Sequence, residues 1–332
     1  MRGGISRWAA LAALLVLLAG PAFATGTAET QRGATPAAAP GSAEPDGFPM
    51  EVTDSVGNRM TVASRPESII SLSLFSDEVL FELVDPARLA GASSLAASPI
   101  YSNVAERAAR VQPTVDFNVE QIIDIYPDVI FAANWSEADK VAQLRNAGLI
   151  VYQVATPFSV DGIKDEIRAI ARVVGEVDAA EALVARMETR IAALERAVGT
   201  IPESGRATAL DYNTWGTANG VDTTWSEVLR LAGVVNAAAP FQAGDFGQVP
   251  MSKELLVELD PDVIFLPGYV WGDDAGAESF RNEVLRDPAF AGLQAIASGR
   301  VHMVPENLKG TYSQFLIDAA EFVARLVYPD RF

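Results

Sequence analysis

The side chains that most often carry catalysis are scarce in this sequence. His302 is the only histidine, cysteine is absent, and neither a Gly-rich phosphate loop nor a Gly-x-Ser-x-Gly elbow occurs. A serine triad, a zinc hydrolase and a metal carrier built on several histidines would each lack parts. We interpret His302, which lies in an apolar strand pattern, as a core or edge residue. We therefore expect no catalytic residues, no protein-bound metal and no cofactor, with paired carboxylates left open because acids are abundant.

Aromatic residues are placed where a ligand would meet them. Eight fall in or beside predicted loops, mostly just past the carboxyl ends of strands: Tyr101, Trp135, Tyr212, Trp215, Trp225, Phe246, Tyr269 and Trp271. Ligands of open α/β sheets bind outside those strand ends, and aromatic faces hold large planar ligands. The eight residues are predicted to border a cleft for a flat or bulky apolar-faced ligand; the alternative for any one of them is packing between elements. Arg281 and Lys309 either offer positive charge to an anionic ligand or are surface residues.

Among the elements that position these residues, one helix–turn–strand unit is repeated in the sequence. "VEQIIDIYPDVIFAANW" begins at Val119, and "KELLVELDPDVIFLPGYVW" begins at Lys253. In each copy the apolar residues share one helical face, a proline ends the helix, and Val-Ile-Phe follows as a short strand typical of a buried parallel sheet. The repetition predicts two similar lobes, although any α/β protein can reuse such a unit. Each helix carries a glutamate in its first turn, Glu120 or Glu254, where the helix dipole favours a carboxylate.

Strands and helices alternate through the rest of the chain. "MEVTDSVGNRMTV" predicts a hairpin, "SIISLSL" a strand, and "DEVLFELV" a helix capped by Ser76. The stretch 177–198 has neither Gly nor Pro and carries apolar residues at helical spacing, which predicts a helix of about 30 Å. We predict an α/β fold of two Rossmann-like lobes with parallel-rich sheets, at 48–175 and 201–332. A single long helix within 176–200 joins them, with the ligand cleft between the lobes.

The N-terminal segment has the pattern of an export signal. Two arginines precede an apolar run at 8–18 that is too short to span a bilayer, and "AFA" follows as a cleavage site. We expect a cleaved signal peptide over 1–24, a flexible tether over 25–47 and a periplasmic location. Pro21 stands where a lipidated cysteine would be, so no lipid anchor is expected. The net charge of −18 makes nucleic acid and anionic membranes poor partners.

The order of these features resembles a known family. The opening "VTDSVGNRMTV…RPESIISLSLFSDEVLFEL", the doubled unit, the central helix and the closing "GRVHMVP" are similar to periplasmic binding proteins of ABC importers for iron-siderophores, haem and cobalamin. The likeness covers essentially 48–332, although "SLSLFSDE" lacks the proline usual after the first strand. It implies a non-catalytic, monomeric receptor that delivers a metal chelate or corrinoid to a membrane permease dimer. It also implies that Glu120 and Glu254 dock into arginine pockets on the two permease subunits. The alternatives are a molybdate or tungstate binding protein of the same fold, a chelatase-like enzyme, and an adhesin or sensor partner without a small ligand.

Overall fold

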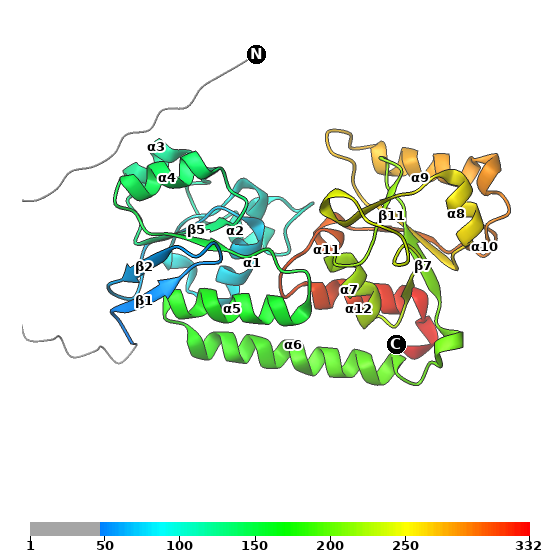
Figure 1. The fold of residues 1–332 in the computed structure, drawn as a ribbon, viewed down its shortest axis with the longest axis horizontal. Helices are drawn as coiled ribbons and strands as arrows, with labels where there is room; N and C mark the ends of the chain where they lie inside the picture. Colours follow the sequence, from blue (N-terminus) through cyan, green and yellow to red (C-terminus); the bar gives the residue numbers. More distant parts are fainter. Residues whose placement is uncertain (1–46) are drawn as a thin grey trace, which may run out of the picture. The chain divides into compact units, whose positions relative to one another are not determined.

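The protein is an α/β structure with two four-stranded parallel sheets. The structure, a computed structural model, describes residues 47–332. The predicted signal peptide and all but the last residue of the predicted tether therefore lie outside the described residues. Within 47–332, no helix is long and apolar enough to cross a membrane. Helices flank both sheets (Figure 1), which confirms the predicted fold class.

The first sheet belongs to the N-terminal half of the described chain. Its parallel strands lie in the order β4-β3-β5-β6 and comprise β3 (Ile69–Ser71), β4 (Leu89–Gly91), β5 (Val129–Ala133) and β6 (Val151–Val154). The helices of this half are α1 (Leu74–Leu83), α2 (Ala105–Ala108), α3 (Val119–Ile125), α4 (Ala138–Asn146) and α5 (Val160–Val174), with 3-10 turns at Pro86–Arg88 and Ser94–Ala97. Every residue of β3, β5 and β6 is buried, as expected of strands covered on both faces.

A β-hairpin precedes this sheet, as predicted. β1 (Met50–Thr53) pairs antiparallel with β2 (Arg59–Val62). Gly57 has a φ of +85°, a conformation that glycine adopts without a Cβ clash. The Asp54 carboxylate holds the turn by accepting a hydrogen bond from the backbone N–H of Asn58 at 2.8 Å.

The start of α1 differs from the prediction. The helix begins at Leu74, and its cap is Ser73, whose Oγ accepts a hydrogen bond from the backbone N–H of Ser76. The predicted cap, Ser76, is therefore wrong. Its hydroxyl lies inside the first turn, where the hydroxyls of Ser71 and Ser73 lie within 2.8 Å and 2.7 Å. Three serines in this short segment, Ser71, Ser73 and Ser76, could each cap a helix, and the sequence alone does not distinguish them.

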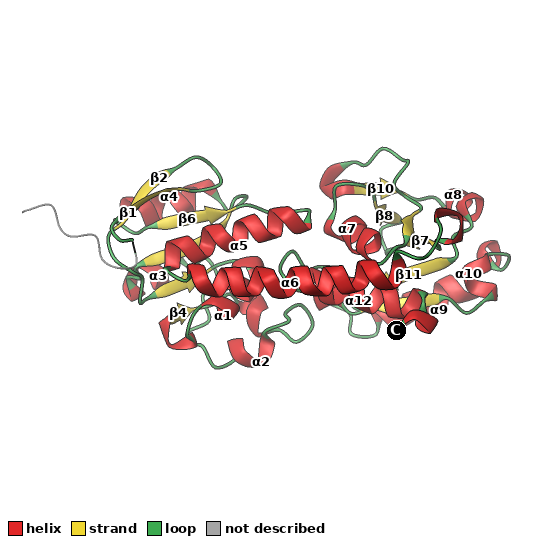
Figure 2. Ribbon diagram, turned by 90° about the horizontal axis from the view of Figure 1, so that it is seen from below, coloured by secondary structure: helices red, strands yellow, loops and turns green. Residues whose placement is uncertain are grey.

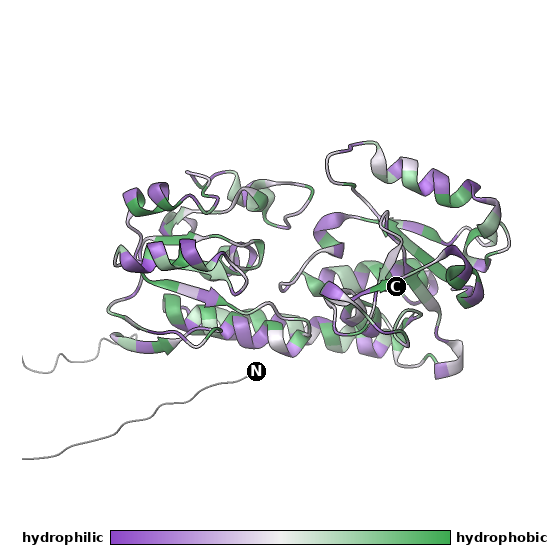
Figure 3. Ribbon diagram, turned by 45° about the horizontal axis from the view of Figure 1, so that its top comes forward, coloured by the Kyte–Doolittle hydropathy of each residue, from purple (hydrophilic) through white to green (hydrophobic). Residues whose placement is uncertain are grey.

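The second sheet repeats the arrangement in the C-terminal half. Its parallel strands lie in the order β12-β11-β7-β9 and comprise β7 (Thr208–Asp211), β9 (Val235–Asn236), β11 (Val263–Pro267) and β12 (Val301–Val304). A separate antiparallel pair joins β8 (Thr217–Asn219) and β10 (Gln248–Pro250). The helices are α7 (Thr224–Leu231), α8 (Lys253–Leu259), α9 (Gly276–Arg286), α10 (Gln294–Ala297), α11 (Glu306–Lys309) and α12 (Leu316–Val327), with 3-10 turns at Glu203–Gly205, Asp245–Gly247, Pro288–Phe290 and Pro329–Arg331. In Figure 3 the strands are mostly hydrophobic, whereas the helices carry both hydrophobic and hydrophilic residues.

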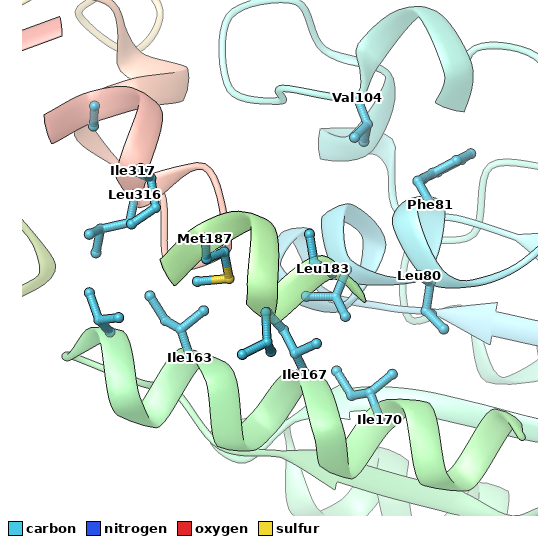
Figure 4. Close-up of a cluster of buried hydrophobic side chains, with 14 of the residues drawn as sticks. Leu80, Phe81, Val104, Ile163, Ile167, Ile170, Leu183, Met187, Leu316 and Ile317 are labelled. Atoms are coloured by element: carbon cyan, nitrogen blue, oxygen red, sulfur yellow. The ribbon is translucent and has the colours of Figure 1, made fainter. Parts of the chain in front are cut away.

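One long helix packs against both halves. α6 (Val177–Val198) has the predicted bounds, and its 22 residues extend about 33 Å. It contacts α1 and α5 of the first half and α7 and α12 of the second (Figure 2). Figure 4 shows Leu183 and Met187 of α6 beside apolar residues of the other helices, within a hydrophobic cluster that runs through both halves. Burial of this shared apolar surface holds the two halves together.

The doubled unit folds in the same way in both sheets. Asn118 and Ser252 cap α3 and α8, each accepting a hydrogen bond from a backbone N–H three residues later. The helices end at Tyr126 and Asp260, which adopt the left-handed conformation with φ of +50° and +36°. The proline that follows cannot continue a helix, so each chain turns directly into its strand.

The aspartate after each proline ties two neighbouring strands together. The Asp128 carboxylate accepts hydrogen bonds from the backbone N–H groups of Glu67 and Ser68, both at 2.8 Å, just before β3. The Asp262 carboxylate accepts one from the N–H of Thr208 at 2.8 Å, at the start of β7. Since β3 pairs with β5 and β7 pairs with β11, each aspartate fixes the beginning of the adjacent strand. Pro-Asp-Val-Ile-Phe therefore serves the same structural purpose twice.

Candidate ligand-binding site

A cavity of about 680 Å³ lies at the carboxyl ends of the second sheet's strands. Most of the residues that line it come shortly after β7, β11 or β12 in the chain, and the first half contributes Tyr101 and Phe158. The aromatic residues of the lining are Tyr101, Phe158, Trp215, Trp225, Phe246, Tyr269, Trp271 and Tyr312. Its main polar residues are Asn213, Asn219, Thr223, Thr224, Gln248, Glu306 and Lys309. The position agrees with the general preference of ligands for the carboxyl ends of parallel strands.

Six of the eight aromatic residues predicted for the cleft line this cavity, namely Tyr101, Trp215, Trp225, Phe246, Tyr269 and Trp271. The side chains of Trp215, Phe246 and Trp271 are 83%, 96% and 78% exposed. When an apolar-faced molecule binds, it removes this aromatic surface from water, and the free energy of binding becomes more favourable. The cavity therefore suits a ligand with broad apolar faces.

The other two predicted residues, Trp135 and Tyr212, do not line this cavity. Trp135 follows β5 as Trp271 follows β11, and it is 76% exposed in the first half. Tyr212 is buried in the second half, with its ring 5.7 Å from that of Phe280 and 6.2 Å from that of Phe290. Neighbouring residues at a strand's end point to opposite faces, so a position just past a strand does not by itself place a side chain in the cavity.

Tyr101 brings the two halves together at the cavity wall. Its ring meets Tyr269 edge to face at 5.8 Å and lies 5.7 Å from the ring of Trp271. Close by, the Asn103 Nδ2 donates to the Asn307 carbonyl at 2.8 Å, and the Asn307 Nδ2 donates back to the Asn103 Oδ1 at 3.0 Å. These reciprocal contacts make the wall continuous between the halves.

The lysine of the cavity is bound to a buried carboxylate. Lys309 Nζ lies 2.7 Å from Asp211 Oδ2, and Asp211 is fully buried. Asp211 also accepts hydrogen bonds from the backbone N–H and the Nδ2 of Asn219, at 2.8 Å and 2.6 Å. The ammonium lies 4.6 Å from the ring centroid of Trp225, within the range of a cation–π contact. The charge of Lys309 is therefore compensated inside the protein.

Arg281, the other cationic residue considered for an anionic ligand, lies outside the cavity. It belongs to α9 and pairs with Glu278 of the same helix at 3.2 Å. His302 is half-buried in β12 beside Phe265, and burial lowers the pKa of its imidazole. No group of three or more histidine, aspartate or glutamate residues suited to a metal ion occurs between residues 47 and 332.

Glu306 is the second charged residue in the cavity lining. It begins α11, directly after Pro305 and β12, and lies one turn before Lys309. Within the described part of the chain its carboxylate has no hydrogen bond and no ion pair at 4.0 Å or less. Burial raises the pKa of this carboxyl group, and nearby Lys309 partly offsets the effect. Glu306, Phe158 and Tyr312 are not among the residues predicted for the cleft, because that prediction rested on eight other aromatic residues and on Arg281 and Lys309.

The uncharged polar side chains Asn213, Asn219 and Gln248 line the cavity and are linked through Thr217, which is not part of the lining. Thr217 Oγ1 donates to Gln248 Oε1 at 2.7 Å, and Gln248 Nε2 donates to Asn219 Oδ1 at 2.8 Å. Asn213 Nδ2 donates to Thr217 Oγ1 at 2.8 Å. The amides thus satisfy one another and hold their orientation, as buried polar networks generally must.

The same order of helices and strands occurs in proteins of known class. Residues 69–308 match the periplasmic binding protein family. The chain belongs to this family. That membership confirms the resemblance inferred from the sequence and makes the chain an extracytoplasmic binding protein rather than an enzyme.

The relatives of this periplasmic binding protein include two proteins named for different ligands and one without a named ligand. A cobalamin-binding protein of Halobacterium salinarum is 29% identical over 65% of this chain, which spans 58% of that relative's length. An uncharacterised ABC transporter substrate-binding lipoprotein of Bacillus subtilis, YvrC, is 26% identical over 100% of this chain and 98% of its own. The structure of the Haemophilus influenzae protein MolA bound to molybdate superposes with a TM-score of 0.69 at 20% identity, covering 85% of this chain and 92% of MolA. At that identity the likeness to MolA concerns the fold alone.

Proposed function

We propose that this protein is the substrate-binding component of an ABC importer. Its ligand would be an iron chelate (an iron-siderophore or haem) or a cobalamin-type corrinoid. The protein would capture this ligand and deliver it to the permease. The observation that carries the choice of ligand is an aromatic cavity of about 680 Å³ whose lysine is already neutralised. A cavity of this size and aromatic character falls in the range of organic ligand sites. The cobalamin-binding relative and the ABC transporter relative support the same assignment.

A molybdate or tungstate binding function fits the cavity less well. A desolvated oxyanion requires unshared positive charge or converging hydrogen-bond donors. Here Lys309 is committed to Asp211, and Glu306 adds a negative charge to the lining. An adhesin or sensor role without a small ligand would leave the eight aromatic residues of the lining without a purpose.

Ligand titration tests the assignment. We expect cobalamin, haem or a ferric siderophore to quench the tryptophan fluorescence of the purified protein, because Trp215 and Trp271 lie in the lining. Isothermal titration calorimetry run alongside separates binding from optical absorption by the ligand. Saturable binding of molybdate or tungstate, with no binding of any chelate or corrinoid, would overturn the proposal.

We further propose that Glu120 and Glu254 dock the receptor onto the permease. Each stands in the first turn of its helix, α3 or α8, and each is exposed. Hydrogen bonds with its own backbone N–H and with Ser252 lower the pKa of Glu254, which keeps it ionised. One carboxylate on each half, placed by the same folding unit, suits charge-assisted contact with a two-subunit partner.

The docking proposal is tested with the Glu120→Ala/Glu254→Ala double variant. Ligand affinity in solution should stay within about twofold, whereas binding to the permease in vesicles and transport should fall by at least tenfold, since each lost charge pair is worth about 1 kcal/mol or more. Glu258, exposed on the same helix as Glu254, provides the matched control as Glu258→Ala. Normal transport by the double variant would contradict the proposal.

A further inference from the structure

The cavity has an excess of one negative charge. Two charged side chains line it, Glu306 and Lys309, and the lysine forms an ion pair with Asp211 behind the wall. Glu306 has no such partner among the residues that the structure describes. A ligand filling the cavity therefore meets an acceptor that the protein itself does not satisfy.

Glu306 lies at the part of the wall where the two halves meet. Its neighbour Asn307 forms the reciprocal amide pair with Asn103 of the first half. The charge of Glu306 also acts on Tyr101. The pKa of the Tyr101 phenol is raised chiefly by burial, then by Tyr269 and then by Glu306. Glu306 lines the cavity together with Tyr101, Tyr269 and Trp271, and the Tyr101 ring contacts the rings of the other two. A flat ligand held by these rings would bring its edge toward the carboxylate.

An ionised carboxylate accepts hydrogen bonds and donates none. It is satisfied by carboxamide N–H groups or by a cationic group on the ligand. A carboxylate on the ligand at the same place would add a second negative charge without a donor between them, and like charges in a partly desolvated site repel strongly.

We propose that Glu306 selects ligands whose periphery carries carboxamide or cationic groups and discriminates against ligands whose periphery carries carboxylates. The inference rests on the proposed capture of a macrocyclic chelate and adds the chemistry of the macrocycle's edge. Corrinoids with amidated side chains satisfy this requirement, and macrocycles with free propionates do not.

A pair of ligands that differ only at the edge tests this selection. Cobinamide carries carboxamides around the corrin, whereas cobyrinic acid carries carboxylates on the same cobalt macrocycle. Their dissociation constants are measured by calorimetry with the wild-type protein, Glu306→Gln and Glu278→Gln. The last variant removes the same charge from α9, outside the cavity lining, and so corrects for the general repulsion between an acidic protein and an acidic ligand. Circular dichroism verifies that the variants fold.

We expect the wild type to bind the amide form about 10- to 100-fold more tightly than the acid, as for hydrogen bonds to a charged group. Glu306→Gln should reduce this ratio at least fivefold, and Glu278→Gln should leave it unchanged. Acidification should reduce the ratio for the wild type, because protonation of Glu306 removes its charge, and should reduce it less for Glu306→Gln.

The outcomes separate this inference from the proposed function. If the wild type binds both corrinoids equally, or if Glu306→Gln leaves the ratio unchanged, the selection by Glu306 is refuted while capture of corrinoids stands. If the wild type binds neither corrinoid, the selection by Glu306 is refuted; if haem, its dimethyl ester and ferric siderophores also fail to bind, the proposed function fails with it.

Discussion

Replacing Lys309 by methionine should destabilise the folded protein because it leaves a carboxylate buried without its counter-ion. Asp211 is fully buried, and Lys309 is its only ion-pair partner in the described chain. Methionine retains most of the apolar length of lysine, so the loss of packing is small. The variant therefore measures chiefly the cost of the uncompensated charge.

The magnitude follows from three contributions. Removing one partner of a buried ion pair costs about 3 to 5 kcal/mol. Loss of the contact between the ammonium and the Trp225 ring, at 4.6 Å, adds about 0.5 to 2 kcal/mol. The two hydrogen bonds from Asn219, at 2.8 Å and 2.6 Å, remain and reduce the penalty. We expect a net loss of about 3 kcal/mol in the free energy of unfolding.

Urea denaturation followed by circular dichroism measures this loss. The matched control is the double variant Asp211→Asn/Lys309→Met, which removes both charges and should recover at least half of the lost stability. A Lys309→Met variant as stable as the wild type would show that the ammonium does not compensate Asp211. Lys309 would then be available to an oxyanion.

Three further predictions follow from particular contacts. Burial raises the pKa of Asp77 to about 7, so the folded state holds a proton that the unfolded state releases, and stability should fall as pH rises from about 4 to 7. Asp77→Asn should remove the contribution of this carboxyl group, about 2 to 3 kcal/mol between pH 5 and pH 8, in urea titrations at those two pH values. Trp271→Ala should weaken binding of the captured chelate about tenfold or more in calorimetric titrations, whereas Trp135→Ala, at the equivalent place outside the cavity, should change it less than twofold. Asp128→Ala and Asp262→Ala should each lower the free energy of unfolding by about 1 to 3 kcal/mol in urea, because each leaves strand-end N–H groups without their acceptor.

Most of the fold follows from local patterns in the sequence. The 177–198 helix was predicted with its observed bounds, because apolar residues at helical spacing and the absence of Gly and Pro act within one segment. The cap of α1 was misplaced because Ser71, Ser73 and Ser76 are chemically equivalent and only their backbone geometry distinguishes them. The role of Asp128 in the doubled unit was also missed, since the N–H groups that it binds lie about 60 residues earlier in the chain.

The candidate site was predictable in location and only partly in composition. The carboxyl ends of parallel strands indicated where it lies, and six of the proposed aromatic residues line the cavity. The sequence could not assign Tyr212 to the core, because the packing of its ring against Phe280 and Phe290 depends on distant segments. Glu306 carries no motif, yet it follows a strand end just as the aromatic residues do. It lies only three residues before Lys309, which was considered for its charge.

The charge of the cavity depends on the order of strands in the second sheet. Asp211 is the last residue of β7, and Lys309 belongs to the short helix after β12, with β11 between the two strands. The two residues of the ion pair are 98 positions apart in the chain. The sequence alone therefore shows a lysine near the ligand site, and only the fold shows that Asp211 neutralises its charge. Because this pairing forms as the sheet assembles, the lysine is neutralised before any ligand arrives. The net charge of the site is then set by the unpartnered carboxylate of Glu306, three residues earlier. The cavity, where Lys309 was considered as a partner for an anionic ligand, is thereby better suited to ligands that bring hydrogen-bond donors.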